Sequence, residues 1–215
     1  MHLVNVPARL HQLGVIPVVS LERAESATAL AEALLVGGLP CAEITFRTAA
    51  AEPSIRAISS AFPEILVGAG TVLNEEQVER AVAAGAKFIV SPGFSSTVVN
   101  LCQEKNIPVF PGICTPTDIM MALEAGLTVL KFFPADAFGG LKTLKALSAP
   151  FPNVEFIPTG GISAANLEEY LSFKKVLACG GSWMVKSELL NSGNFAEITR
   201  LAEEAVAIKR KVRPE

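Results

Sequence analysis

Histidine is nearly missing from this sequence. The 215 residues contain two, His2 and His11, and both lie near the N-terminus. Histidine is the side chain that most often binds catalytic zinc and related metals, so this sequence has too few histidines for a histidine-rich metal site. We therefore expect no metal, and no pattern in the sequence indicates another cofactor.

Paired cysteines are also absent. The four cysteines lie far apart, with no C-x-x-C motif: Cys41, Cys102, Cys114 and Cys179. No secretory signal pattern opens the chain, so nothing points to an oxidising compartment. We expect reduced, mostly buried thiols in a cytoplasmic protein.

Neither blocks of like charge nor long apolar runs occur. The 18 Lys and Arg residues and the 21 Asp and Glu residues are dispersed, and the formal net charge is −3. This balance argues against a nucleic-acid partner. No uninterrupted apolar run reaches the roughly 18 residues of a membrane span, so no membrane partner is expected. Half of the residues are nevertheless hydrophobic, which is enough for a sizeable core.

What the sequence does contain is a repeated alternation of short apolar runs and longer segments of helical period. The runs are rich in Val, Ile and Phe and recur about every 21 to 26 residues, the length of one βα unit. These strand candidates are residues 15–20, 41–46, 65–70, 87–92, 108–113, 128–133, 155–160 and 176–181.

Helix-start and helix-stop signals lie between these runs. Asn74 with Gln77 forms a capping pair, and Thr115 precedes a proline at the first helical position. Gly85 and Gly126 stand where helices should end before the next strand. The segments between the strands are therefore predicted to be helices.

Such a series of βα units predicts a parallel sheet covered by helices. A (β/α)8 barrel fits the number of βα units best, although the chain is shorter than the usual ~250 residues of such barrels. An open doubly wound sheet is the alternative, but such sheets more often stop at about five or six strands. We predict one compact α/β barrel domain over residues 1–215, with a closing helix at about 195–211.

The stretch VLKFFPAD, residues 129–136, places Lys131 between apolar residues of a predicted strand. Lysine is rarely buried without a partner. One interpretation is structural, with Lys131 paired to Glu43 inside the barrel. The other is a nucleophile that forms a Schiff base, because apolar neighbours such as Phe132 and Phe133 disfavour the ammonium form.

Further polar residues follow other predicted strands, at the end of the barrel where such folds hold their active sites. Alternation puts Glu43, Thr45 and Arg47 on one face of the second strand and its exit. Glu43 is either a counter-ion or a general acid and base, and Arg47 either a surface residue or a clamp for a substrate carboxylate. The remaining strand-end residues are Thr71, Pro92, Phe133 and Thr159.

Two glycine pairs follow the last two predicted strands, in TGGIS (159–163) and GGSW (180–183). A single pair usually marks a tight turn. Bare glycine backbone ahead of a helix also forms an anion site, and barrels commonly place a phosphate after strands seven and eight. The two pairs together favour a phosphate site.

The motifs AEITFR, GAGTVL, SPG, FPG, KFFPA, PTGGI and GGSW, in this order and spacing, resemble the 2-keto-3-deoxy-6-phosphogluconate (KDPG) and 4-hydroxy-2-oxoglutarate (KHG) aldolase family. The resemblance runs from about Gly14 to Val185. It implies a metal-independent class I aldolase on a compact barrel, assembled as a homotrimer, that acts on small keto acids and sugar-acid phosphates.

The same resemblance assigns roles to individual residues. Lys131 matches the Schiff-base lysine and Glu43 the general acid and base. The pyruvyl end of the substrate, with its carboxylate, is matched by Arg47, Thr71, Pro92 and Phe133. The phosphate and hydroxyl end is matched by Thr159, Gly160, Gly161, Gly181 and Ser182.

Thr159 favours the gluconate substrate, since related phosphogalactonate enzymes tend to have an apolar residue there. Departures from the family pattern, at Ala42 and Asp118, do not touch the chemistry.

Three alternatives remain open on the sequence alone. The chain is a different phosphate-handling barrel enzyme, such as an epimerase or synthase; or a non-catalytic metabolite-binding barrel with Lys131 in a structural ion pair; or an aldolase whose physiological substrate is KHG.

Overall fold

Parallel strands form the centre of the protein in the computed structural model, which describes residues 5–214. A six-stranded sheet has the order β5-β4-β3-β2-β1-β9, and a three-stranded sheet has the order β6-β7-β8. The strands are β1 (Val15–Val19), β2 (Cys41–Thr45), β3 (Leu66–Gly70), β4 (Ile89–Val90), β5 (Val109–Phe110), β6 (Gly112–Ile113), β7 (Val129–Phe132), β8 (Glu155–Pro158) and β9 (Cys179–Gly181). Every predicted strand region contains at least one of them.

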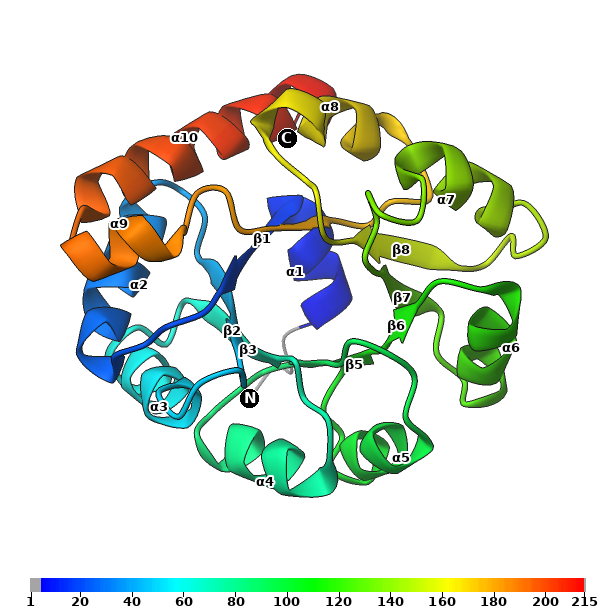
Figure 1. The fold of residues 1–215 in the computed structure, drawn as a ribbon, viewed down its shortest axis with the longest axis horizontal. Helices are drawn as coiled ribbons and strands as arrows, with labels where there is room; N and C mark the ends of the chain where they lie inside the picture. The colour runs from blue at the N-terminus through cyan, green and yellow to red at the C-terminus, as the bar shows by residue number, and fades with distance from the viewer. Residues whose placement is uncertain (1–4, 215) are drawn as a thin grey trace.

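The two sheets close into a single barrel. On one side, only Pro111 separates β5 from β6, so the two segments are one strand interrupted at a residue that has no backbone N–H. On the other side, the isolated parallel bridges Phe156↔Val176 and Thr159↔Gly180 join β8 to β9. Figure 1 shows the resulting ring of strands. The predicted (β/α)8 barrel is confirmed, and the open doubly wound sheet is wrong.

Helices surround the ring and lie outside the strands (Figure 1). They are α2 (Ala27–Val36), α3 (Ala51–Ala61), α4 (Glu75–Ala83), α5 (Ser96–Glu104), α6 (Pro116–Glu124), α7 (Gly140–Ser148), α8 (Ala164–Ser172), α9 (Ser187–Ser192) and α10 (Phe195–Val212), with a 3-10 turn, η1 (Ala24–Ser26). The predicted closing helix is α10, and it packs against α2 and α8. Among the described helices, none combines the length and apolar character that crossing a bilayer requires.

The predicted helix ends are present. The Asn74 side chain accepts a hydrogen bond from the Gln77 backbone N–H at 2.9 Å, at the start of α4. Thr115 caps α6 and its side chain accepts from the Asp118 N–H at 3.2 Å. Gly85 and Gly126 follow α4 and α6 with φ of +100° and +75°. Glycine adopts this left-handed conformation without steric cost, so each helix turns directly into the next strand.

Neither α9 nor the helix that closes the amino end of the barrel was predicted. This helix, α1 (Val6–Leu13), precedes β1 and buries Val6 and Leu10. Both side chains join an apolar cluster inside the barrel that includes Ile16, Leu66 and Phe88. The barrel is therefore apolar at its amino end, and polar side chains enter its interior at the carboxyl end.

Candidate active site

A cavity of about 810 Å³ opens at the carboxyl ends of the strands. Its size is typical of a small-molecule site. All of the predicted site residues except Glu43 line it, namely Arg47, Thr71, Pro92, Lys131, Phe133, Thr159, Gly160, Gly161, Gly181 and Ser182. The barrel thus brings together side chains that are far apart in the sequence.

Lys131 and Glu43 form a buried pair in the barrel interior. Lys131 lies on β7 and Glu43 on β2, and Lys131 Nζ is 3.5 Å from Glu43 Oε1. The side chains are only 6% and 3% exposed, respectively. The amine reaches the cavity and the carboxylate lies behind it, so the pair can exchange protons at one edge of a substrate site.

Gly70, the last residue of β3, makes room for the carboxylate. A Cβ atom at this position would lie 2.1 Å from Glu43 Oε1 and 2.6 Å from Glu43 Cγ. Contacts this short do not occur between real atoms, so any other residue at position 70 would displace Glu43. The second glycine of the GAG motif, Gly70, is therefore required for steric reasons.

The two phenylalanines after Lys131 take different sides of the barrel wall. Phe133 lines the cavity, and its ring centroid is 5.0 Å from Lys131 Nζ. Phe132 is fully buried in the cluster between strands and helices. Because successive strand residues face opposite sides, only Phe133 contributes to the apolar surroundings of the amine. The expectation that both flank it is wrong for Phe132.

Arg47 and Thr45 lie beyond Glu43 on the same strand and its exit, but they differ in function. Arg47 is exposed at the mouth and, within residues 5–214, makes no hydrogen bond or ion pair. Its guanidinium is available for two parallel hydrogen bonds to a carboxylate. Thr45 is fully buried and donates to the Val19 carbonyl at 2.9 Å, which makes it a structural residue.

Thr71 follows β3 at the rim of the cavity in an unusual backbone conformation. Its φ is +55°, in the left-handed region. For a β-branched residue this conformation is a genuine outlier, and such strain concentrates at binding and catalytic sites. The Thr71 side chain is thereby held toward the cavity that it lines.

The two glycine pairs lie side by side at the ends of β8 and β9, and β8 pairs directly with β7, the strand of Lys131. The bridge between Thr159 and Gly180 joins the ends of their two strands. Gly160 and Gly161 have φ of +95° and +81°, and a Cβ on Gly161 would lie 2.2 Å from Asp136 Cβ. Bare backbone N–H groups next to the start of α8 form the kind of surface that holds a phosphate.

Several lining residues were not predicted. They are Val18, Ser20, Ile162, Val185, Lys186, Ser187 and Glu188, whereas Gly180 belongs to the glycine pair of GGSW. Ser20 directly follows β1, so the strand-end rule that selected the other residues would have found it. Lys186, Ser187 and Glu188 lie in the loop and first turn after β9, beyond the GGSW motif. No local pattern marks them.

Residues 5–214 contain no group of three or more His, Cys, Asp or Glu side chains arranged to hold a metal ion. Three buried thiols have raised pKa values, mainly because burial disfavours the thiolate; they are Cys41, Cys102 and Cys179. These thiols are therefore poor nucleophiles, and none of them lines the cavity.

Comparison with known proteins agrees with this geometry. Residues 6–201 match the family model described as KDPG and KHG aldolase. A 2-dehydro-3-deoxy-phosphogluconate aldolase of Treponema pallidum is 47% identical over 96% of this chain and 98% of its own length. The KHG/KDPG aldolase of Escherichia coli K12 is 46% identical over 89% of this chain and 90% of its own length.

A solved structure gives the same result in three dimensions. It is a KDPG aldolase from Legionella pneumophila with pyruvate captured at low pH as a covalent carbinolamine intermediate. Its TM-score is 0.89 at 41% identity, covering 93% of this chain and 97% of the other. With the family model spanning the barrel and these relatives matching almost their whole lengths, the chain belongs to the KDPG and KHG aldolase family.

Proposed function

We propose that this protein is a class I aldolase that cleaves 2-dehydro-3-deoxy-6-phosphogluconate to pyruvate and glyceraldehyde 3-phosphate. A second reaction is the cleavage of 4-hydroxy-2-oxoglutarate to pyruvate and glyoxylate. The observation that carries the proposal is the buried amine of Lys131, 3.5 Å from the Glu43 carboxylate at the inner edge of the cavity.

The reaction begins at the C2 carbonyl of the substrate. The neutral Lys131 amine attacks this carbon and forms a carbinolamine, and Glu43 moves a proton to the departing hydroxyl, which leaves as water. The product is an iminium that withdraws electrons from the C3–C4 bond. An iminium is a far better electron acceptor than the neutral ketone, which is the reason for the covalent step.

Cleavage follows from that electron withdrawal. The C4 hydroxyl loses its proton to the Glu43 carboxylate, which the loss of water left unprotonated; the C3–C4 bond breaks, and its electron pair forms the enamine of pyruvate on Lys131. Glyceraldehyde 3-phosphate leaves. A proton is then delivered to C3 by Glu43, and water hydrolyses the resulting iminium to release pyruvate and restore the lysine.

The rest of the cavity fits the two ends of this substrate. Arg47 holds the carboxylate, and Thr71, Pro92 and Phe133 surround the pyruvyl part. The distal phosphate and hydroxyls bind at the ends of β8 and β9, on Thr159, Gly160, Gly161, Gly181 and Ser182. Ten of these assigned residues, Lys131 included, share one cavity, which supports a single substrate bridging them.

The experiment is intact-protein mass spectrometry after incubation with pyruvate and sodium borohydride. Wild type should gain one pyruvyl-sized adduct that maps to the peptide containing VLKFFPAD, and Lys131→Arg should gain none. An adduct on the variant, or none on folded wild type, would refute the covalent mechanism and favour a binding barrel or another phosphate-handling enzyme.

The choice between the two substrates is tested separately. A phosphate subsite that contributes binding energy should give KDPG the higher kcat/KM. Ser182→Ala should then lower kcat/KM for KDPG and leave that for KHG, which has no phosphate, close to wild type. Equal losses for both substrates would contradict the assignment of Ser182 to the phosphate.

The protein is further proposed to act in the cytoplasm as a homotrimer without nucleic-acid or membrane partners. Apolar side chains exposed on one helix support self-association: Met120, Met121 and Leu123 of α6 are 55%, 43% and 36% exposed. Such surfaces often mark contacts between protein chains.

A further inference from the structure

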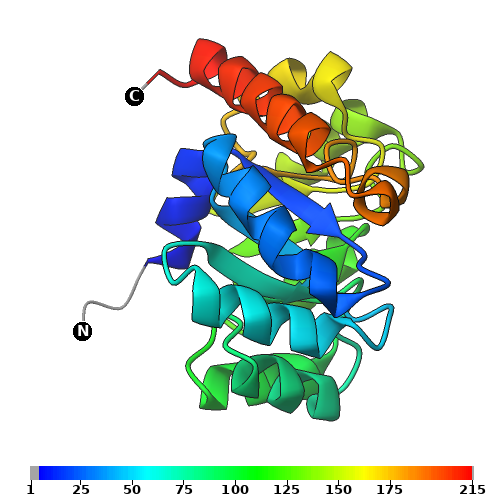
Figure 2. The same cartoon turned by 90° about the vertical axis from the view of Figure 1, so that its left-hand side faces the viewer.

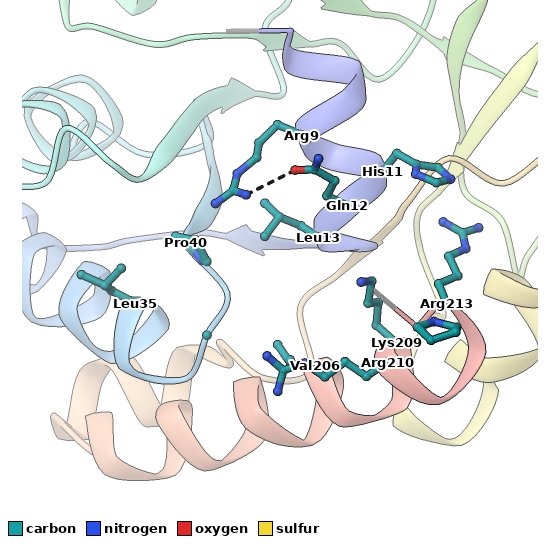
Figure 3. Close-up of a pocket in the computed structure, with 12 residues that line it drawn as sticks. Arg9, His11, Gln12, Leu13, Leu35, Pro40, Val206, Lys209, Arg210 and Arg213 are labelled. Atoms are coloured by element: carbon teal, nitrogen blue, oxygen red, sulfur yellow. Dashed lines mark hydrogen bonds between the residues drawn. The ribbon is translucent and has the colours of Figure 1, made fainter.

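A second cavity, of about 730 Å³, lies at the opposite end of the barrel from the catalytic mouth. It lies between α1, the turn leading from α2 into β2, and the last turns of α10 (Figure 3). These segments adjoin the amino ends of the strands. The reaction described above uses none of the residues that line this cavity.

Lys209 of α10 is the unusual residue of this cavity. It is only 7% exposed. Its stem packs over the backbone of Gly14, where a Cβ would lie 2.7 Å from Lys209 Cγ. Figure 3 shows its amino group turned into the cavity toward α1. Within residues 5–214 this amino group has neither a hydrogen-bond acceptor nor an ion-pair partner.

An unpartnered buried ammonium is costly in free energy, because burial removes most of its water without replacing it by a counter-charge. Buried charges in folded proteins are normally paired, so an anion that binds in the cavity would supply the missing partner. Lys209 is thus a positive charge to which residues 5–214 provide no carboxylate partner.

The other charged residues lining the cavity have the same sign. Arg9, Arg210 and Arg213 lie on its wall, and no Asp or Glu is among the described residues that line it. The Arg213 guanidinium donates to the carbonyls of Leu171 and Leu177, so backbone dipoles hold it in place. This positive site contrasts with the formal net charge of −3 of the chain.

The dipole of α10 explains only part of this pattern. Cations are favoured in the last turn of a helix. That accounts for Lys211, which is exposed and pairs with Glu168 at 2.7 Å. It does not account for a lysine on the same turn that is buried and faces a cavity.

Another part of the wall is apolar and is formed by Leu13, Leu35, Pro40 and Val206, and the polar side chains of His11 and Gln12 also line the cavity. From the charged side and the apolar side together, we propose that this cavity binds a small organic anion. Its phosphate or carboxylate group contacts Lys209, and its apolar part lies against the opposite wall. The site is separate from the catalytic cavity and takes a ligand that does not undergo the aldol reaction.

The test uses phenyl phosphate and benzoate as probes, with phenol as the neutral control, in calorimetric titrations at constant ionic strength. Wild type should bind at least one of the two anions and should bind phenol much more weakly. The tighter of the two anions identifies the preferred head group. Failure of both anions to bind more tightly than phenol overturns the proposal.

Variants locate the binding. Lys209→Met keeps an unbranched stem over Gly14 and removes the charge, so it should weaken anion binding at least about tenfold, the effect of one charge-assisted hydrogen bond. Lys211→Met, the same change on an exposed and paired lysine, should bind as wild type does. Unchanged binding in Lys209→Met overturns the proposal.

Competition at the catalytic mouth is measured in the same preparations. Phenyl phosphate can also inhibit cleavage by occupying the phosphate subsite, and this inhibition constant and kcat/KM should be the same in wild type and Lys209→Met. If Lys209→Met does not fold, Arg9→Gln replaces it and should also weaken anion binding. If Lys209→Met weakens only the inhibition by phenyl phosphate and leaves the titrated anion binding unchanged, the anion binds in the catalytic cavity and the second site is refuted.

Discussion

Lys131 and Glu43 form a buried ion pair at the inner edge of the cavity. Each is almost completely buried, and each is the other's charged neighbour within the described interior. Breaking a buried pair by removing one partner leaves an uncompensated charge. Substitutions that preserve shape and change only charge are therefore the informative ones at this site.

Glu43→Gln keeps the size of the side chain and removes its ability to move protons. We expect the fold to persist and kcat for KDPG cleavage to fall by about 10²–10⁴-fold, the usual contribution of general acid–base catalysis. A coupled assay of pyruvate release measures kcat. Glu124→Gln, on the exposed face of α6, is the control and should match wild type; an unchanged kcat in Glu43→Gln would remove its catalytic role.

Gly70→Ala tests the position of the carboxylate without changing any chemical group. The new methyl group would lie 2.1 Å from Glu43 Oε1, so the carboxylate must shift. Misplacement of a catalytic group by about 1 Å can cost about 10²-fold in rate. We expect kcat in steady-state assays to fall by that order. Borohydride should still trap pyruvate on the variant, but more slowly than on wild type.

The matched control for Gly70→Ala is Gly126→Ala. Gly126 has φ of +75°, and a methyl group added there would meet no atom within 4 Å, so the substitution strains only the backbone of a distant turn. It should lower the melting temperature and leave kcat unchanged. Equal kcat values for the two variants would show that Gly70 is needed only for stability.

At the scale of the element, the strands were predictable because each is a near-continuous apolar run, as expected when both faces of a parallel sheet are covered. The facing of Lys131 and Phe133 was predictable from strand alternation. The opposite facing of Phe132 follows from the same rule, but sequence proximity to Lys131 obscured it. The six residues of α9 are too few to show a repeated apolar spacing. The first helix, α1, does have local signals, because Asn5 caps it, Val6 and Leu10 lie four residues apart and Gly14 ends it, but it precedes the first predicted strand and was not expected.

The start of α6 combines a cap with a charged group. Asp118 Oδ2 accepts backbone hydrogen bonds from Cys114 at 3.0 Å and Thr115 at 2.9 Å. Burial by itself raises the pKa of Asp118, but these hydrogen bonds outweigh burial, and the pKa lies below its ordinary value. The helix therefore begins at a carboxylate that the fold keeps ionised.

Asp118→Asn should lower the free energy of unfolding at pH 7 by about 0.5–2 kcal/mol, the range for helix caps. Because the folded-state pKa is depressed, this contribution is present above the unfolded pKa of ~3.9 and is lost as pH falls through the lower folded value. Urea unfolding at pH 7 and at decreasing acid pH measures it. A difference between variant and wild type that grows toward acid pH would contradict the assignment.

At the scale of the whole molecule, self-association would cover apolar surface that the isolated barrel leaves exposed. Sedimentation equilibrium should give three times the chain mass of 22.6 kDa. Met120→Glu combined with Met121→Glu should shift the mass to one chain, since burying two carboxylates in an apolar contact is unfavourable. Val36→Glu is the control, on an apolar side chain that is 67% exposed on α2. A wild-type monomer would refute the trimer.

The candidate site was more predictable than its surroundings. Residues on β2, β3, β7 and β8 were found because strand ends in a parallel barrel converge on one mouth, whatever their distance in the sequence. Lys186 and Glu188 escaped prediction because a loop after the last strand has no period to read. The cavity around Lys209 escaped as well, since it joins the first and last helices and only the closed barrel brings these together.

The position of α1 and α10 also determines how this barrel can be handled. The described chain begins just ahead of α1 and ends just after α10, and both points lie at the end of the barrel remote from the catalytic mouth (Figure 2). A tether attached at either point would leave from the closed side. The protein can therefore be immobilised on a solid support, or joined to a partner enzyme, with its mouth still open to the solution.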